Sequence, residues 1–501
     1  MQGRTRRLAP FLAAAVVTLV GPTSARAQTP DPKSDPAGGA QKTAPDADPA
    51  ALEAAAKKAL KAWRYAHLQQ EAAELEARIL RARLLRLEAD KSARKGEQGD
   101  GGSSKSEGKT PDKAAAVREA RLKTAMGRAL RILQGRRREA AGRFLDAGRK
   151  VEAALAVSPD VLALHAGRAK LFATMADSGR SVGATLGPAG ERRLLDFSVF
   201  EKGLASALRA HKALPDDAFL TWAAARLLTV FNRFEEARAL LAPAASGAAA
   251  QDRDRLLLAT LDFYTERWDS AITLAESIKD SAMRTEAEDL VRIAKHVREL
   301  AAAEAILRKR EAAEDTLPRV ELRFGERKIV LELFEDTTPN TVANFIKLVE
   351  SGFYEGTRIH RALSAFLVQG GDPETREGGQ ESKIGRGGPG WRLADEFGVK
   401  DGQRVGRAHL PGVIAMARGR GEDSAGSQFY LTLAPLPYLD GRAVVFGRIV
   451  EGADVPGALR AGDRLTGARV LRKREHAYQP KTLPPLAPGS GESGGEGSGG
   501  Q

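Results

Sequence analysis

The chain has 501 residues and a formal net charge of +13, from 78 Lys and Arg against 65 Asp and Glu. Its length suits about two to four structural units, and a hydrophobic content of 42% excludes wholesale disorder. The chain contains no cysteine. That excludes disulfides, Cys-ligated zinc or iron–sulfur clusters and cysteine nucleophiles. The surplus of positive charge raises the question of an anionic partner.

Residues 1–27 resemble a secretory signal peptide. Three arginines precede an apolar run at 8–20, and the small-x-small sequence Ala25-Arg26-Ala27 follows it. The run is too short to span a bilayer, which favours a cleaved signal over an uncleaved anchor. The sequence therefore predicts export, with the bacterial periplasm as the expected location and the extracellular space as the alternative. Export also argues against a nucleic-acid partner.

Linker composition separates the predicted helical segments. Residues 28–50 and 96–113 are rich in Gly, Pro, Ser and Asp, and residues 479–501 form a Gly-rich tail. We expect all three to be disordered. Residues 51–95 lack Gly and Pro and predict one long charged helix. Whether this helix packs on the rest of the chain or on another chain is left open.

Residues 114–315 predict a helical domain with an internal repeat. Phe200, Phe234 and Trp268 are 34 residues apart, and a small residue follows each aromatic three positions later. These small residues, which would let a neighbouring helix approach, are Gly203, Ala237 and Ala271. The period resembles the tetratricopeptide repeat, whose helix pairs stack because none buries its apolar face alone. The repeat predicts a surface for a protein partner, and an ordinary helical bundle is the alternative.

The positive charge is concentrated in residues 114–157. This segment holds 11 basic and four acidic residues. Such a segment is commonly a solvated helix face. The alternative is a site for an anionic partner, such as the headgroups of the cell envelope.

The pattern changes at about residue 318. Two short apolar runs, 319–324 and 329–334, flank Gly325-Glu326 and predict a β-hairpin. Thr338-Pro339 then opens a stretch with helical periodicity that Gly352 ends. Threonine favours the N-cap, proline the first turn, and glycine the position after the helix.

Several motifs follow in a consistent order. They are ELFEDTTPNTVANFIKLVESGFYEGTRIHRALSAFLVQGGDP (332–373), GRGGPGWRLADEF (385–397), GVIAMARG (412–419), SAGSQFYLTL (424–433) and YLDGRAVVFGRIVEG (438–452). Residues 316–478 thereby resemble a cyclophilin-type peptidyl-prolyl isomerase. The resemblance implies a closed eight-stranded antiparallel β-barrel capped by helices, and cis/trans isomerisation of X–Pro bonds in peptides or unfolded client proteins.

The reaction explains the residues that the resemblance assigns to the site. The rotation barrier is about 18–20 kcal/mol because the amide has partial double-bond character. No bond breaks, so the reaction calls for no metal or cofactor, and a fixed donor beside the prolyl nitrogen stabilises the twisted amide. Arg361 matches the family's catalytic arginine, Phe366 the floor of the proline pocket, and Gln369 the glutamine that orients arginine and substrate. The matching substrate-binding positions are His360, Leu367, Ala417, Arg418, Gln428, Phe429, Tyr430, Tyr438 and Leu439. For Phe429 a place in the core is favoured over contact with substrate.

Three positions depart from the family pattern. Tyr430 stands for a second phenylalanine, Tyr438 for a tryptophan and Ala443 for a histidine of the pocket rim. These changes predict activity below that of a typical relative. They also keep open a second hypothesis, a non-catalytic scaffold of the cell envelope that binds proline peptides. The seven histidines show no metal-ligand spacing, so no metal is expected.

Overall fold

The computed structural model describes residues 48–96, 113–177, 183–185, 197–247, 250–400, 403–419 and 421–485. The described residues fall into two compact units that divide between Leu171 and Phe172. We call them the N-terminal unit and the C-terminal unit. The predicted signal peptide, residues 28–47 of the first predicted linker, and the linker 96–113 apart from Gly96 and Lys113 lie outside the described residues. The last two residues of the linker 28–50 already belong to a helix.

The N-terminal unit is built on two long helices, α2 (Pro49–Gly96) and α3 (Lys113–Val157), followed by the first part of α4 (Leu162–Asp177). Buried alanines line the contact between α2 and α3: Ala56 packs near Val151 and Ala154, whereas Ala77 packs near Ala129. The two helices are therefore antiparallel. The predicted helix 51–95 is confirmed. It packs against α3, the next helix of the same chain.

The C-terminal unit begins with the end of α4 and six further helices. They are α5 (Phe197–Ala213), α6 (Ala218–Val230), α7 (Phe234–Ser246), α8 (Asp252–Tyr264), α9 (Trp268–Glu276) and α10 (Arg284–Glu314). The starts of α6 and α8 are 34 residues apart, as are those of α7 and α9. The turns inside the two pairs correspond as well, because Asn232 and Glu266 both adopt positive φ, at 59° and 62°.

Small residues lie where the helices approach. A Cβ on Gly203 would lie 2.7 Å from the Phe172 ring, and Ala237 and Ala271 are fully buried. The predicted helix pairs and the role of these small residues thus agree with the structure. Assignment to the tetratricopeptide family remains a prediction.

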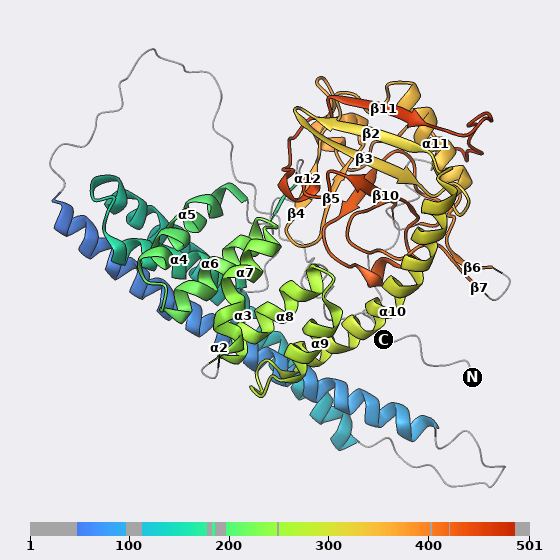
Figure 1. Ribbon diagram of the computed structural model, residues 1–501. Coiled ribbons are helices and arrows are strands. Elements are labelled where there is room, and N and C mark those ends of the chain that lie inside the picture. Colours follow the sequence, from blue (N-terminus) through green and yellow to red (C-terminus); the bar gives the residue numbers. More distant parts are fainter. Residues whose placement is uncertain are drawn as a thin grey trace, which may run out of the picture. The chain divides into compact units, whose positions relative to one another are not determined.

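One antiparallel sheet follows the helices (Figure 1). Its order is β1-β4-β5-β9-β8-β10-β3-β2-β11. The strands are β1 (Gly183–Thr185), β2 (Arg319–Phe324), β3 (Arg327–Leu333), β4 (Arg361–Leu363), β5 (Leu367–Gly370), β8 (Val413–Met416), β9 (Phe429–Thr432), β10 (Val445–Glu451) and β11 (Gly467–Arg472). A separate hairpin pairs β6 (Gly398–Lys400) with β7 (Gln403–Val405).

The sheet is a curled half-barrel rather than the closed barrel that the sequence predicts. Its terminal strands are β1 and β11, so the regular ladders of the described residues leave it open. Short hydrogen bonds partly bridge the gap. The amide of Ile359 donates to Asp463 O at 2.9 Å, and that of Leu465 donates to Thr357 O at 2.8 Å. Between these segments Arg358 and Arg464 form one isolated antiparallel bridge rather than a further ladder, and closure is not confirmed.

Helix α11 (Pro339–Glu350) confirms the predicted helix, and Gly352 follows it with φ of 70°. Its capping differs from the expectation. Thr338 occupies the cap position, but its hydroxyl donates to Phe334 O at 3.0 Å. The Glu396 carboxylate instead accepts from the amides of Asn340 and Thr341, at 3.0 and 2.7 Å. A distant carboxylate therefore satisfies the donors that a local hydroxyl was expected to satisfy.

Helix α10 is attached to the sheet by a buried ionic cluster. Arg407 donates to Glu304 and, at 2.6 Å, to Glu311, both on α10. Arg448 on β10 joins Glu311 at 2.7 Å and Glu332 at 2.5 Å. All five side chains are more than nine-tenths buried. Burial alone would raise the pKa of Glu311, but hydrogen bonds and charge from Arg407 and Arg448 lower it overall.

The chain stays attached to the rest of the cyclophilin-like fold past the predicted domain end at 478, through Arg392 and through Asn340 on α11. Leu483 exchanges two backbone hydrogen bonds with Arg392, and the Lys481 amide donates to Asn340 at 2.6 Å. Residues 479–485 therefore do not belong to a disordered tail. The remaining structure comprises α12 (Val455–Ala458) and the short 3₁₀ turns η1 (Pro373–Thr375), η2 (Glu381–Lys383) and η3 (Pro437–Leu439). Within the described ranges no helix has the length and apolar character needed to cross a membrane.

Candidate active site

The site is built on the hairpin of β4 and β5. Arg361 and Gln369 are directly opposed across this hairpin. The turn between the strands contains Ala365, whose φ of 51° is unusual for a residue with a side chain. Phe366 follows it and leads into β5. The hairpin therefore brings Arg361, Phe366 and Gln369 close together.

An apolar patch lies beside this hairpin. Its partly buried members are Phe366, Ala417, Tyr438 and Leu439, which pack on a fully buried layer. That layer includes Leu367, Tyr430 and Ala443. The rings of Phe366 and Tyr438 stack with centroids 6.1 Å apart and an interplanar angle of 16°. Aromatic faces held in this way offer a surface for a proline ring.

Arg361 supplies the polar group beside the patch. Among the described residues its guanidinium forms no hydrogen bond or ion pair. Burial lowers the pKa of Arg361, and the nearby Tyr438 partly offsets this change. An arginine remains protonated in proteins, so its donors are available to an incoming peptide.

Gln369 and Gln428 form the polar side of the site. Gln369 Nε2 donates to Gln428 Oε1 at 3.0 Å, and Gln428 Nε2 donates to Gly387 O at 2.9 Å. In the described structure Gln369 is thereby held by Gln428 and makes no hydrogen bond to Arg361. The orienting role expected of Gln369 toward the arginine is therefore not seen in this conformation.

The next edge is formed by Ala417 and Arg418 after β8. The amide of Ala417 donates to Gln428 O at 2.8 Å. The Arg418 side chain forms an ion pair with Asp395 and lies 5.2 Å from the centroid of the Phe397 ring. Because the Arg418 guanidinium is already paired with Asp395, the backbone of this edge is the part that could bind a peptide.

Two residues of the predicted substrate surface, Phe429 and His360, have buried side chains in the structure. Phe429 is fully buried and packs edge-on against Phe345 and Tyr354 in the core. His360 is also buried, and neither of its ring nitrogens has a partner among the described residues. The reason is the two-residue period of a strand: His360 precedes Arg361, and Phe429 lies between Gln428 and Tyr430. The core position of Phe429 agrees with the interpretation that the sequence favours, and a substrate contact by His360 stays a prediction.

A pair of residues that the sequence did not indicate supports the apolar patch. The Tyr430 hydroxyl is 2.8 Å from His409 Nε2, and His409 Nδ1 is 2.8 Å from Asp440 Oδ1. A carboxylate only accepts, so Nδ1 donates and leaves Nε2 of a neutral ring to accept from Tyr430. The extra hydroxyl of Tyr430 is thus satisfied behind the patch. A buried tyrosine in place of phenylalanine was the available signal, because it requires such a partner.

The comparisons with known proteins concern the part of the chain that carries this site. The family model for cyclophilin type peptidyl-prolyl cis-trans isomerases matches residues 319–473. A peptidyl-prolyl cis-trans isomerase of Synechococcus elongatus is 37% identical over 145 residues, which cover 28% of this chain and 89% of the relative. Peptidyl-prolyl cis-trans isomerase B of Bacillus subtilis is 36% identical over 143 residues, covering 28% and 90%.

The chain belongs to the cyclophilin-type peptidyl-prolyl cis-trans isomerase family. Similar solved structures include a Hirschia baltica cyclophilin, with 26% identity, a TM-score of 0.26, and coverage of 31% of this chain and 74% of that one. A Cryptosporidium parvum cyclophilin, solved in the presence of the dipeptide Ala-Pro, has 24% identity and a TM-score of 0.25 and covers 30% and 98%.

The cyclophilin domain is a peptidyl-prolyl cis-trans isomerase, and its geometry suits amide rotation. The stacked rings of Phe366 and Tyr438 can hold the proline, while Arg361 offers donors beside them. Twisting the amide localises the nitrogen lone pair, and a preorganised donor there stabilises the twisted form more than either planar form.

Proposed function

We propose that this chain is an exported isomerase that rotates X–Pro bonds in unfolded client proteins, with its helices serving for protein interaction. The observation that carries the catalytic part is the Arg361 guanidinium beside the apolar patch, which has no hydrogen-bond or ion-pair partner among the described residues. An extended proline-containing segment would place its ring on Phe366 and its prolyl nitrogen toward Arg361. No further reactant is called for, because only a torsion changes.

The decisive experiment measures cis/trans isomerisation of a short proline peptide by the full chain. Arg361→Ala should lower kcat/KM about 100-fold, the usual effect of removing one transition-state donor. Arg469→Ala is the matched control, because this β11 arginine is 65% exposed and only weakly paired with Glu321. An Arg361→Ala variant with wild-type activity would refute the assignment. A wild-type protein that binds the peptide but does not turn it over would instead support the scaffold alternative.

Export rests on residues 1–27, which combine arginines, an apolar run and a small-x-small site. We expect a bacterial host to release a mature chain that begins at Gln28, with a corresponding loss of intact mass in the envelope fraction. Ala25→Asp with Ala27→Asp should leave the precursor uncleaved. Full-length protein confined to the cytoplasmic fraction would contradict the proposal.

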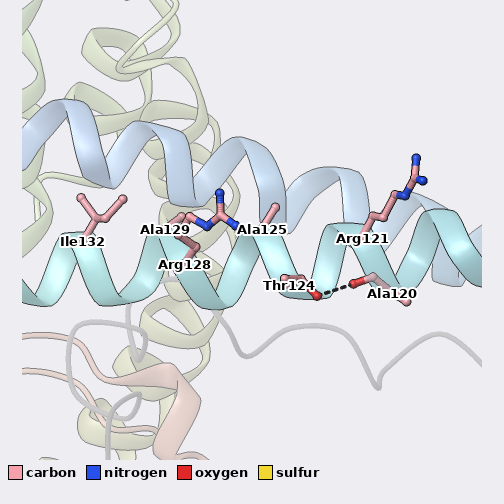
Figure 2. Close-up of a pocket in the computed structure, with 7 residues that line it drawn as sticks. All are labelled: Ala120, Arg121, Thr124, Ala125, Arg128, Ala129 and Ile132. Carbon is pink, nitrogen blue, oxygen red and sulfur yellow. Dashed lines mark hydrogen bonds between the residues drawn. The ribbon is translucent and has the colours of Figure 1, made fainter.

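The basic segment 114–157 supports a second role, contact with an anionic surface. Arg121 and Arg128 are exposed on α3 and border a shallow depression of about 530 Å³ (Figure 2). Ile132 on the same depression is 46% exposed. Cationic side chains with an apolar neighbour suit the boundary of an anionic membrane.

Co-sedimentation with vesicles tests this role. The full chain should bind vesicles of anionic phospholipid at low ionic strength and release them in about 0.5 M salt, because surface charge is screened. Arg121→Glu with Arg128→Glu should weaken binding, whereas Arg469→Glu in β11 should not. Equal binding to zwitterionic vesicles would contradict an electrostatic contact.

A further inference from the structure

The turn between α6 and α7 contacts the turn that carries Phe366. Asn232 lies in this helical turn with φ of 59°. Its Oδ1 accepts from the amide of Ala365 at 2.8 Å, and its Nδ2 donates to Gly457 O at 3.0 Å. In the residue before Ala365, Ser364 Oγ donates to Thr229 O at 3.1 Å. Two hydrogen bonds thus join the helices to the β4–β5 turn.

The second side of the contact is aromatic. The Arg460 guanidinium lies 4.3 Å from the centroid of Phe197 and 5.7 Å from that of Phe231. Arg460 also donates to Gly457 O at 3.0 Å, the same carbonyl that Asn232 reaches. The helical turn is therefore seated between α12 and the β4–β5 turn.

The β4–β5 turn needs such support. Ala365 adopts φ of 51°, a left-handed conformation that is strained for a residue with a Cβ. Its amide has no strand partner and donates to Asn232 instead. If the turn relaxed, the next residue, Phe366, would change its direction relative to Arg361. The two groups that must hold the proline and its nitrogen together would then separate.

We propose that Asn232, on the helical repeats, is a positioning residue of the isomerase site and holds the Ser364–Phe366 turn in its catalytic conformation. It touches no substrate and acts through Ala365. The inference depends on the isomerase activity of this chain, but separate results would contradict each proposal. An inactive wild type would contradict the proposed function. An active wild type with an equally active Asn232 variant would contradict the role of Asn232.

The test compares variants that keep the backbone of the helical turn. Asn232→Gly tolerates positive φ but removes both side-chain hydrogen bonds. Asn232→Asp tolerates the same φ and keeps an acceptor for the Ala365 amide, while losing the donor to Gly457. Glu266→Gly is the matched control, because Glu266 occupies the equivalent position 34 residues later with φ of 62°. No described hydrogen bond joins Glu266 to the β4–β5 turn.

Isomerisation of a short proline peptide by the full chain provides the readout. A peptide of four residues is too short to require the helices as a docking surface. Asn232→Gly should lower kcat/KM about 3- to 10-fold, the effect of losing a net hydrogen bond. Asn232→Asp should recover most of that loss, and Glu266→Gly should match the wild type.

Amide hydrogen exchange separates positioning from general stability. In Asn232→Gly the amides of 363–366 should exchange faster, while those of β8 and β9 stay protected. Wild-type kcat/KM together with wild-type exchange in Asn232→Gly would overturn the proposal. Uniformly faster exchange throughout the C-terminal unit, with no recovery in Asn232→Asp, would also overturn it, because the role would then be structural only.

Discussion

The two compact units hold their helices in different ways. In the N-terminal unit, buried alanines such as Ala73, Ala77 and Ala129 line the contact between α2 and α3. In the C-terminal unit, α10 is fastened to the sheet by buried ion pairs, and the α6–α7 turn by hydrogen bonds. Apolar contact tolerates change in either helix, whereas buried polar contacts are costly when one partner is missing.

The difference matters for the catalytic site. In the described structure the helices of the C-terminal unit contact the cyclophilin domain at several places, among them the ionic cluster around Arg407 and the turn before Phe366. The isomerase site is consequently not independent of the helical region that precedes it. The sequence predicts a helical domain at 114–315 and an isomerase domain at 316–478, but the compact unit that begins at Phe172 includes both helices and the sheet.

The largest expected effect comes from the ionic cluster. Glu311→Ala leaves Arg407 and Arg448 buried with one acceptor fewer each. We expect a loss of about 3–5 kcal/mol in the free energy of unfolding of the C-terminal unit. Glu314→Ala, three residues further along α10, removes an exposed carboxylate and is the control. Denaturant unfolding checks both, and equal stability of the two variants would show that the cluster does not fasten α10.

A second prediction concerns pH and His360. Burial lowers the pKa of His360 from 6.5 to about 4 in the folded chain. Between these values the unfolded chain binds the proton and the folded chain does not, so stability falls as pH drops from about 6.5 toward 4. The loss is about 3 kcal/mol at most. His360→Gln should flatten the unfolding free energy across this window relative to the wild type. An unchanged slope would show that His360 does not titrate as its burial indicates.

The smallest effect compares the two units by the same substitution. Gly203→Ala places a Cβ against Phe172 and should destabilise α5 by about 1–3 kcal/mol. Gly148→Ala on α3 meets nothing within 4 Å and should stabilise its helix by up to about 1 kcal/mol. Hydrogen exchange resolved by helix measures both changes. If both substitutions destabilised their helices, or both stabilised them, the two glycines would not differ in packing as described.

Much of the fold followed from local sequence. The hairpin around Gly325, the helix that begins at Pro339 and the 34-residue spacing of Phe234 and Trp268 are each set by short-range patterns. The resemblance also placed Arg361, Phe366 and Gln369 at one hairpin. It did not distinguish the faces of neighbouring side chains such as His360 and Arg361, because a motif names neighbours in sequence, whereas a strand turns alternate side chains to opposite faces.

Sequence alone determined the chemistry of this protein: a cyclophilin domain, an arginine at its site and an apolar patch beside it. Tertiary structure alone decided what supports that site. Glu396 caps α11 from 55 residues away, His409 satisfies the hydroxyl of Tyr430, and Asn232 reaches Ala365 across 133 residues. Such partners have no sequence period, because a buried donor takes whichever acceptor the fold brings within hydrogen-bond distance.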